Sequence, residues 1–253
     1  MGKIKSMKQM KDVFQSKIMR GMIISLSVSV VLMLTMAVVM FVFANTTDRT
    51  YFSWGFGDGS YEDRLRYSNF IIMCMGIFDI VLALFKFVEL FAAFGVYKKY
   101  PKSIGFNIIK IIAIVMSVIC SAAFAVLFVG AFVLAVTSDQ GYKLAAFRSM
   151  IVPAIVVFFP TLKFISLSVT VTSVKKQLTN GVLLLIISTA VLIACDFITV
   201  VDTLSDIRYY SVISLNVAAV FLVFGVVDLF TFLIARYYAK IQFAEKNQNM
   251  DKI

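Results

Sequence analysis

Four long apolar stretches without a charged residue constrain this chain more than any other feature. They run from residue 21 to 43, 111 to 138, 177 to 195 and 209 to 227. A helix of about 20 apolar residues is long enough to cross the hydrocarbon core of a bilayer, which is about 30 Å thick. Each stretch is therefore predicted to be a transmembrane helix.

Two further apolar segments, 67–97 and 148–174, are interrupted by charged residues or prolines. Both are still predicted to cross the membrane, because lipid does not tolerate loops whose backbone groups lack hydrogen bonds. The predicted fold class is all-α: a polytopic membrane protein built as a bundle of six transmembrane helices. The approximate predicted spans are 21–43, 67–97, 108–138, 148–174, 179–201 and 209–235.

The composition excludes a soluble fold. Hydrophobic residues make up 61% of the 253 residues and charged residues 15%, and the mean hydropathy is +0.94. Soluble domains carry roughly 45–50% apolar and about 25% charged residues. The predicted organisation is a basic cytoplasmic segment (1–20), a transmembrane domain (21–236) and a cytoplasmic tail (237–253), with no room for a separate catalytic domain.

The distribution of basic residues predicts the orientation. With the amino terminus inside, sixteen of the 24 Lys and Arg residues flank the inner ends of the spans and six flank the outer ends. Basic residues accumulate on the cytoplasmic side of membrane proteins. Both termini are thus expected in the cytoplasm, and a cell membrane is the expected location. The net charge of +10 indicates contact with anionic lipid headgroups and not nucleic-acid binding.

The amino-terminal segment has an amphipathic pattern. Apolar residues recur there at helical spacing among lysines, which is typical of a short helix lying on the inner membrane surface. These apolar residues are Ile4, Met7, Met10, Phe14 and Ile18.

Six ionisable residues fall at membrane depth, where each costs on the order of 2.5–3.5 kcal/mol on insertion scales. They are expected to face the protein interior and to find partners. These candidate residues of a solute or ion pathway are Asp79, Lys86, Glu89, Lys163, Asp196 and Asp228.

Two interpretations of these charges remain open. They can line a polar cavity near the midplane that binds a charged or zwitterionic solute or relays a proton or cation. Alternatively, they can be structural ion pairs, Lys86 with Glu89 at i, i+3 and Lys163 with Asp228. Four acids against two bases leave an excess of negative charge, which a cation, a protonated carboxyl or water must balance.

Pro153 and Pro160 predict a helix break in the fourth span, because each removes a backbone donor and clashes with the preceding turn. Broken helices line solute sites in transporters. The alternative is a static kink, with the hydroxyl groups that follow it bonded to their own helix.

Several chemistries are excluded or disfavoured. The chain has no histidine, so catalytic triads and histidine-based zinc sites are unavailable. Cys74, Cys120 and Cys195 lie in apolar runs, which favours buried structural thiols over a metal site or a disulfide framework. No nucleophile–base pair is present, so we expect no enzyme, no cofactor and no bound metal.

Two functions remain. The first is movement of a small solute or ion through a polar cavity at the midplane. The alternative is a non-catalytic membrane partner, such as an assembly, sensory or regulatory subunit, whose buried charges are structural. The expected partners are the lipid bilayer, a small solute or cation, or another membrane protein.

Overall fold

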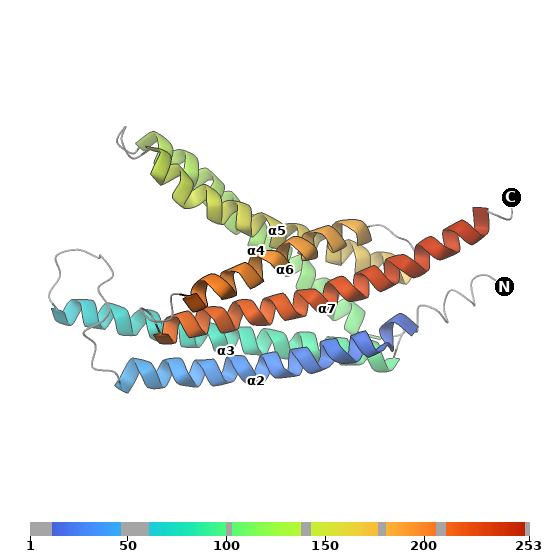
Figure 1. The fold of residues 1–253 in the computed structure, drawn as a ribbon, viewed down its shortest axis with the longest axis horizontal. Helices are drawn as coiled ribbons and strands as arrows, with labels where there is room; N and C mark the ends of the chain where they lie inside the picture. Colours follow the sequence, from blue (N-terminus) through green and yellow to red (C-terminus); the bar gives the residue numbers. More distant parts are fainter. Residues whose placement is uncertain are drawn as a thin grey trace. The chain divides into compact units, whose positions relative to one another are not determined.

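The computed structural model describes residues 12–46, 61–99, 103–137, 143–176, 181–205 and 211–250. Within these ranges it contains six long helices and no strand, and all six are long and apolar enough to cross a membrane. The predicted fold class, an all-α polytopic membrane protein, is confirmed. In chain order the helices are α2 (Lys17–Thr46), α3 (Tyr61–Lys99), α4 (Gly105–Thr137), α5 (Lys143–Lys176), α6 (Val182–Ser205) and α7 (Ser211–Met250) (Figure 1).

Several helices extend beyond the predicted spans. α3 begins at Tyr61 and α5 at Lys143, each a few residues before its predicted span. α7 continues beyond the predicted span, which ends at residue 235, to Met250, so most of the predicted tail (237–253) is helical. This extension is rich in Ala, Glu, Lys and Gln, residues with high helix propensity. Helix propensity therefore favours the part of α7 that lies beyond the predicted span.

The amino-terminal segment is described from residue 12 onward, so the apolar residues Ile4, Met7 and Met10 lie outside the described part. Phe14 is buried, and its ring meets the ring of Phe106 edge-on at 5.3 Å between centroids. The hydroxyl of Ser16 accepts a hydrogen bond from the backbone N–H of Met19 at 3.3 Å, as an N-cap does. This end of the predicted interfacial segment packs on protein, and the cap explains why α2 begins at Lys17.

The helices contribute to two compact units. The hairpin unit comprises residues 1–22, 92–194 and 228–253, and the four-helix unit comprises residues 23–91 and 195–227. Each of α2, α3, α6 and α7 contributes to both units, because the borders between the units fall inside these helices.

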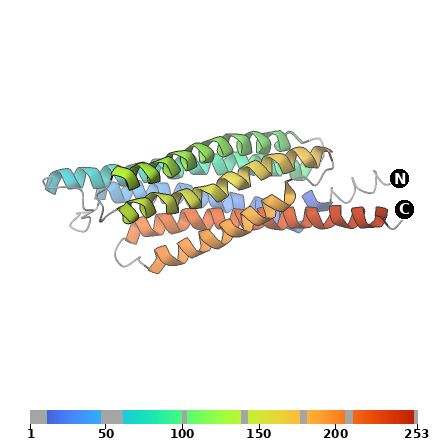
Figure 2. The same ribbon diagram turned by 90° about the horizontal axis from the view of Figure 1, so that it is seen from above.

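In the hairpin unit, α4 and α5 pack side by side (Figure 1 and Figure 2). Ring contacts join them, with centroids 5.6 Å apart for both Phe124–Phe158 and Phe132–Phe147. The beginning of α4 lies against α3, because Gly105 leaves room for the backbone carbonyl of Ala92. A glycine at a helix contact lets two backbones approach closely.

The core of the four-helix unit is formed by small and flexible apolar side chains of α2, α3 and α7. One cluster consists of Met33, Met36, Leu82, Ala83, Ala219, Val220 and Val223. Two glycines bring neighbouring helices close: Gly76 on α3 faces Phe41 of α2, and Gly225 on α7 faces Phe197 of α6. In lipid the interior gains little from apolar burial, so this close packing is what holds the helices together.

Gly105→Ala is predicted to destabilise the protein by about 1–3 kcal/mol, because the added methyl group would collide with the carbonyl of Ala92. Gly130→Ala is the matched control. A methyl group there meets no described atom within 4 Å, and both changes gain about 1 kcal/mol of helix propensity. Thermal unfolding in detergent should give a lower Tm for Gly105→Ala and an unchanged or higher Tm for Gly130→Ala. Equal Tm values would contradict the close contact.

Candidate functional site

The six predicted site residues all lie within the described helices. α3 carries Asp79, Lys86 and Glu89, α5 carries Lys163, α6 carries Asp196 and α7 carries Asp228. Four of them are buried, and Lys163 and Glu89 are partly buried. The prediction that these side chains would lie inside the protein and not in lipid agrees with their burial.

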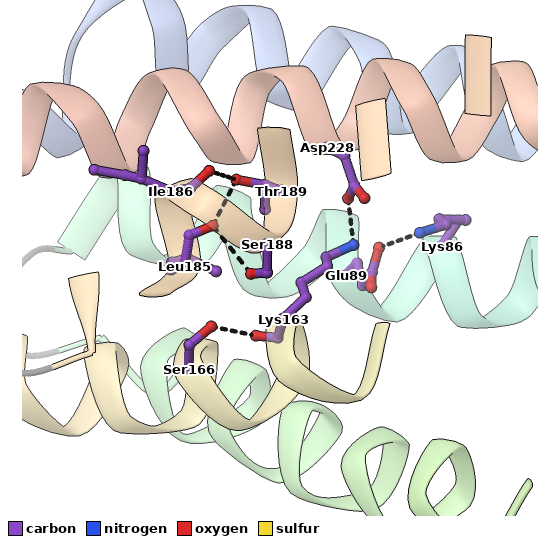
Figure 3. Close-up of polar contacts among 9 residues, drawn as sticks. All are labelled: Lys86, Glu89, Lys163, Ser166, Leu185, Ile186, Ser188, Thr189 and Asp228. Carbon is purple, nitrogen blue, oxygen red and sulfur yellow. Dashed lines mark hydrogen bonds and ion pairs between the residues drawn. The ribbon is translucent and has the colours of Figure 1, made fainter. Parts of the chain in front are cut away.

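Lys163 of α5 and Asp228 of α7 form an ion pair inside the hairpin unit (Figure 3). The Lys163 side chain is 12% exposed and that of Asp228 3%. The ammonium group also lies 5.0 Å from the ring centroid of Phe164. Hydrocarbon cannot solvate either ion, so each stabilises the other and the pair joins α5 to α7.

Lys86 and Glu89 form the second ion pair, on successive turns of α3 in the four-helix unit, with Nζ and Oε2 2.8 Å apart (Figure 3). The Lys86 ammonium lies 5.2 Å from the ring centroid of Phe224 on α7. A cation over an aromatic face is attracted by the ring quadrupole. Lys86 is thus held by a carboxylate on its own helix and by an aromatic ring on another.

Asp79 lies two turns before Lys86 on the same buried face of α3 and is 0% exposed. Its Oδ2 accepts a hydrogen bond from the side-chain amide of Asn216 on α7, which is 2% exposed. Its Oδ1 is also buried and has no hydrogen-bond partner among the described residues. Asp79 therefore has a neutral amide partner and no base in contact, unlike Asp228 and Glu89.

Asp196 is 6% exposed and lies where α6 meets α7 in the four-helix unit. Its Cβ faces Gly225, whose missing side chain leaves room for the acidic residue. Its burial shows that it belongs to the helix–helix contact.

Pro153 and Pro160, where a helix break is predicted, both lie within α5. α5 is continuous from Lys143 to Lys176 across both prolines. Each proline removes only one backbone hydrogen bond, and the flanking turns keep theirs. The Thr161 hydroxyl, directly after the second proline, donates to the carbonyl of Val157 at 3.0 Å, which supports the backbone there.

Three of the hydroxyl groups beyond the prolines bond to α5 itself, whereas the hydroxyl of Thr170 is buried without a hydrogen-bond partner among the described residues. Ser166 donates to the carbonyl of Lys163 at 2.9 Å (Figure 3), Ser168 to that of Ile165 at 2.8 Å, and Thr172 to that of Ser168 at 2.9 Å. For these three residues the bonds fit the alternative in which the hydroxyls bond to their own helix.

An apolar groove of about 650 Å³ runs between α3 and α7 in the four-helix unit. Four phenylalanines form much of its wall, and Asn216, the partner of Asp79, is its polar residue. The lining residues are Phe70, Ile71, Cys74, Met75, Phe78, Asn216, Val217, Val220, Phe221 and Phe224.

Neither the three cysteines nor a metal-binding group adds to the candidate site. Cys120 and Cys195 are partly buried, and Cys74 is exposed in the groove wall, so the predicted burial of Cys74 is wrong. In a membrane protein a helix formed by an apolar run has a lipid-facing side as well as a buried side. The run alone does not show on which side a given cysteine lies. Within the described helices, His, Cys, Asp and Glu side chains form no group of three that would hold a metal ion.

Comparison of the chain with protein-family models, with curated proteins and with solved structures finds no match in any of the three. The functional argument therefore depends on the residues and contacts described above.

Sequence reasoning missed Asn216 as a site residue. The stretch 209–227 is predicted to be a transmembrane helix because it has no charged residue, and a neutral amide does not interrupt such a run. An amide inside a membrane helix needs a hydrogen-bond partner, so Asn216 was a detectable signal. Its partner on α3 depends on how the two helices pack, which the sequence pattern does not give.

Lys163→Met is predicted to destabilise the protein by about 3–5 kcal/mol, because it leaves Asp228 buried without its cation. The double variant Lys163→Met/Asp228→Leu should recover most of this loss, since it removes both charges. Asp202→Asn, at an exposed position on α6, is the control and should have little effect. Unfolding free energies in detergent test the coupling, and strictly additive effects of the two single changes would refute it.

Proposed function

We propose that this multi-pass membrane protein moves a small charged or zwitterionic solute, or an ion, across the membrane. The observation that supports this most directly is the ion pair between Lys163 and Asp228, which joins two different helices at membrane depth. At about 1.5 Å per residue, Lys163 lies about 18 Å from the basic inner end of α5 and Asp228 about 12 Å from that of α7. Ionisable residues at such depth are costly, and they commonly mark solute and ion pathways.

The chemistry of such a pathway follows from the pair itself. A solute that carries a negative group competes with Asp228 for Lys163, and one that carries a positive group competes with Lys163 for Asp228. Binding would then exchange a contact between α5 and α7 for contacts to the solute. Because the pair connects two helices, this exchange would couple occupancy to helix movement. In this proposal the chain is not an enzyme and needs no cofactor.

A second candidate function is that of a non-catalytic membrane partner, such as an assembly, sensory or regulatory subunit. The specific observation in its favour is that both lysines at membrane depth already have internal acidic partners, Lys86 with Glu89 and Lys163 with Asp228. Ion pairs of this kind hold helices in register without any ligand. In this case the double variant that removes both charges should keep full function.

Asp228→Asn is predicted to abolish transport, because it removes the anionic member of the pair while keeping the side-chain size. Reconstituted vesicles adsorbed on a solid support can report charge movement after concentration jumps of sodium, potassium, chloride or glycine. The wild type should give a current with at least one of these solutes, and Asp228→Asn should give none. The control Asp202→Asn should keep the current. A full current from Asp228→Asn would remove this residue from the mechanism and favour the second candidate function.

We also propose that both termini lie in the cytoplasm of a cell-membrane protein, with the basic inner ends of the helices at anionic headgroups. A fluorescent reporter that matures only in the cytoplasm should fluoresce when fused after residue 253. The same reporter inserted between α4 and α5, at 138–142, should be dark. Fluorescence at the second position, or its absence at the first, would overturn this orientation.

A further inference from the structure

Asp79 differs in its surroundings from Glu89 and Asp228, the two ion-paired acids at membrane depth. It is 0% exposed, its Oδ2 is held by the amide of Asn216, and its Oδ1 is buried without a described hydrogen-bond partner. Asp228 and Glu89 each contact a lysine. The Asp79 carboxyl therefore has a fixed position and one oxygen available for a further ligand.

Among the side chains that the structure describes, those of the four-helix unit around Asp79 include no base outside an ion pair. In the four-helix unit, α2 has no ionisable residue between 23 and 46, and α7 has none between 212 and 227. On α3, between 69 and 91, the one base is Lys86, which Glu89 holds. The part of α6 in this unit adds the acids Asp196 and Asp202 and the thiol of Cys195, none of which is a base. The charge of Asp79 is thus not balanced by the described protein.

A lone carboxylate in such a site has two ways to lose its net charge. One is a metal cation, but the hard cations Ca²⁺ and Mg²⁺ take about six or more oxygen ligands. Asp79 and Asn216 together offer at most three side-chain oxygens, and no metal-binding group of three acidic or thiol side chains exists among the described residues. The other is a proton, which needs one oxygen only.

We propose that Asp79 is a proton-binding site inside the membrane, with Asn216 as its positioning residue. The proton binds Oδ1, the carboxylate becomes a neutral carboxyl, and no other bond changes. The proton is taken from water and returned to it. A buried neutral hydroxyl without a partner costs about 1–3 kcal/mol, far less than a buried charge without one. This inference does not require transport. If the chain does transport, Asp79 is the group that would couple it to protons.

The adjacent groove gives the proposal a direct test. Asn216 and Phe78, the neighbour of Asp79 in the chain, both line it. A hydrophobic carbodiimide partitions into apolar sites and adds covalently to a carboxyl only in its protonated form. The proton passes to the carbodiimide nitrogen as the carboxyl oxygen adds to its carbon, and rearrangement leaves a stable N-acylurea on the side chain. No oxidant or second reactant is required.

Dicyclohexylcarbodiimide should modify Asp79 of the full-length protein in lipid vesicles at neutral pH. Peptide mass spectrometry of α3 and α7 should locate the adduct on Asp79, at about tenfold or more the level on Glu89 and Asp228, which each contact a lysine. The adduct should decline as the pH is raised. Asp79→Asn should remove it, and Asn216→Ala should shift the pH at which it declines. No adduct on Asp79, or one that does not depend on pH, would overturn the proposal.

A second measurement does not depend on reagent access. The infrared difference spectrum between the wild type and Asp79→Asn should contain the carbonyl band of a protonated carboxyl at neutral pH. The matched difference for Asp228→Asn should lack it. Absence of the band from the Asp79→Asn difference would also overturn the proposal. The current assay on Asp228→Asn is independent of both readouts, so failure of transport and failure of the proton site are distinguishable.

Discussion

The cost of placing a charge in hydrocarbon determines most of what is distinctive in this structure. Lipid cannot solvate an ion, so each charge at membrane depth must turn inward and find a partner. The ion pair between Lys163 and Asp228 meets this requirement between two helices, and the pair between Lys86 and Glu89 meets it on one helix. Both pairs lie on inward-facing sides of α3, α5 and α7.

Asp79 meets the same requirement differently. It lies on the same face of α3 as Lys86, but its partner is the amide of Asn216, which carries no charge. The two pairs therefore have balanced charges, while Asp79 keeps an excess negative charge unless it binds a proton. The two ion pairs can therefore be purely structural, whereas the contact between Asp79 and Asn216 contains a group whose charge can change with pH.

The sequence predicted the class of fold because apolar length is a local property. Runs such as 111–138 are long enough to cross a bilayer, and such a run satisfies its own backbone only as a helix. It also predicted that the six ionisable residues would turn inward. It did not predict that α5 stays continuous through Pro153 and Pro160, because a proline removes one hydrogen bond and neighbouring turns decide whether the helix survives that loss.

By itself, the sequence determined the number of long apolar helices, the position of each charge along them and an excess of acids over bases among those charges. These quantities depend on residue type and on distance along the chain. Only the tertiary structure decided that Lys163 meets Asp228, that Asn216 holds Asp79 and that Cys74 lies exposed in a groove wall. Such contacts depend on how helices rotate and cross, and that geometry is set by close packing between residues far apart in sequence.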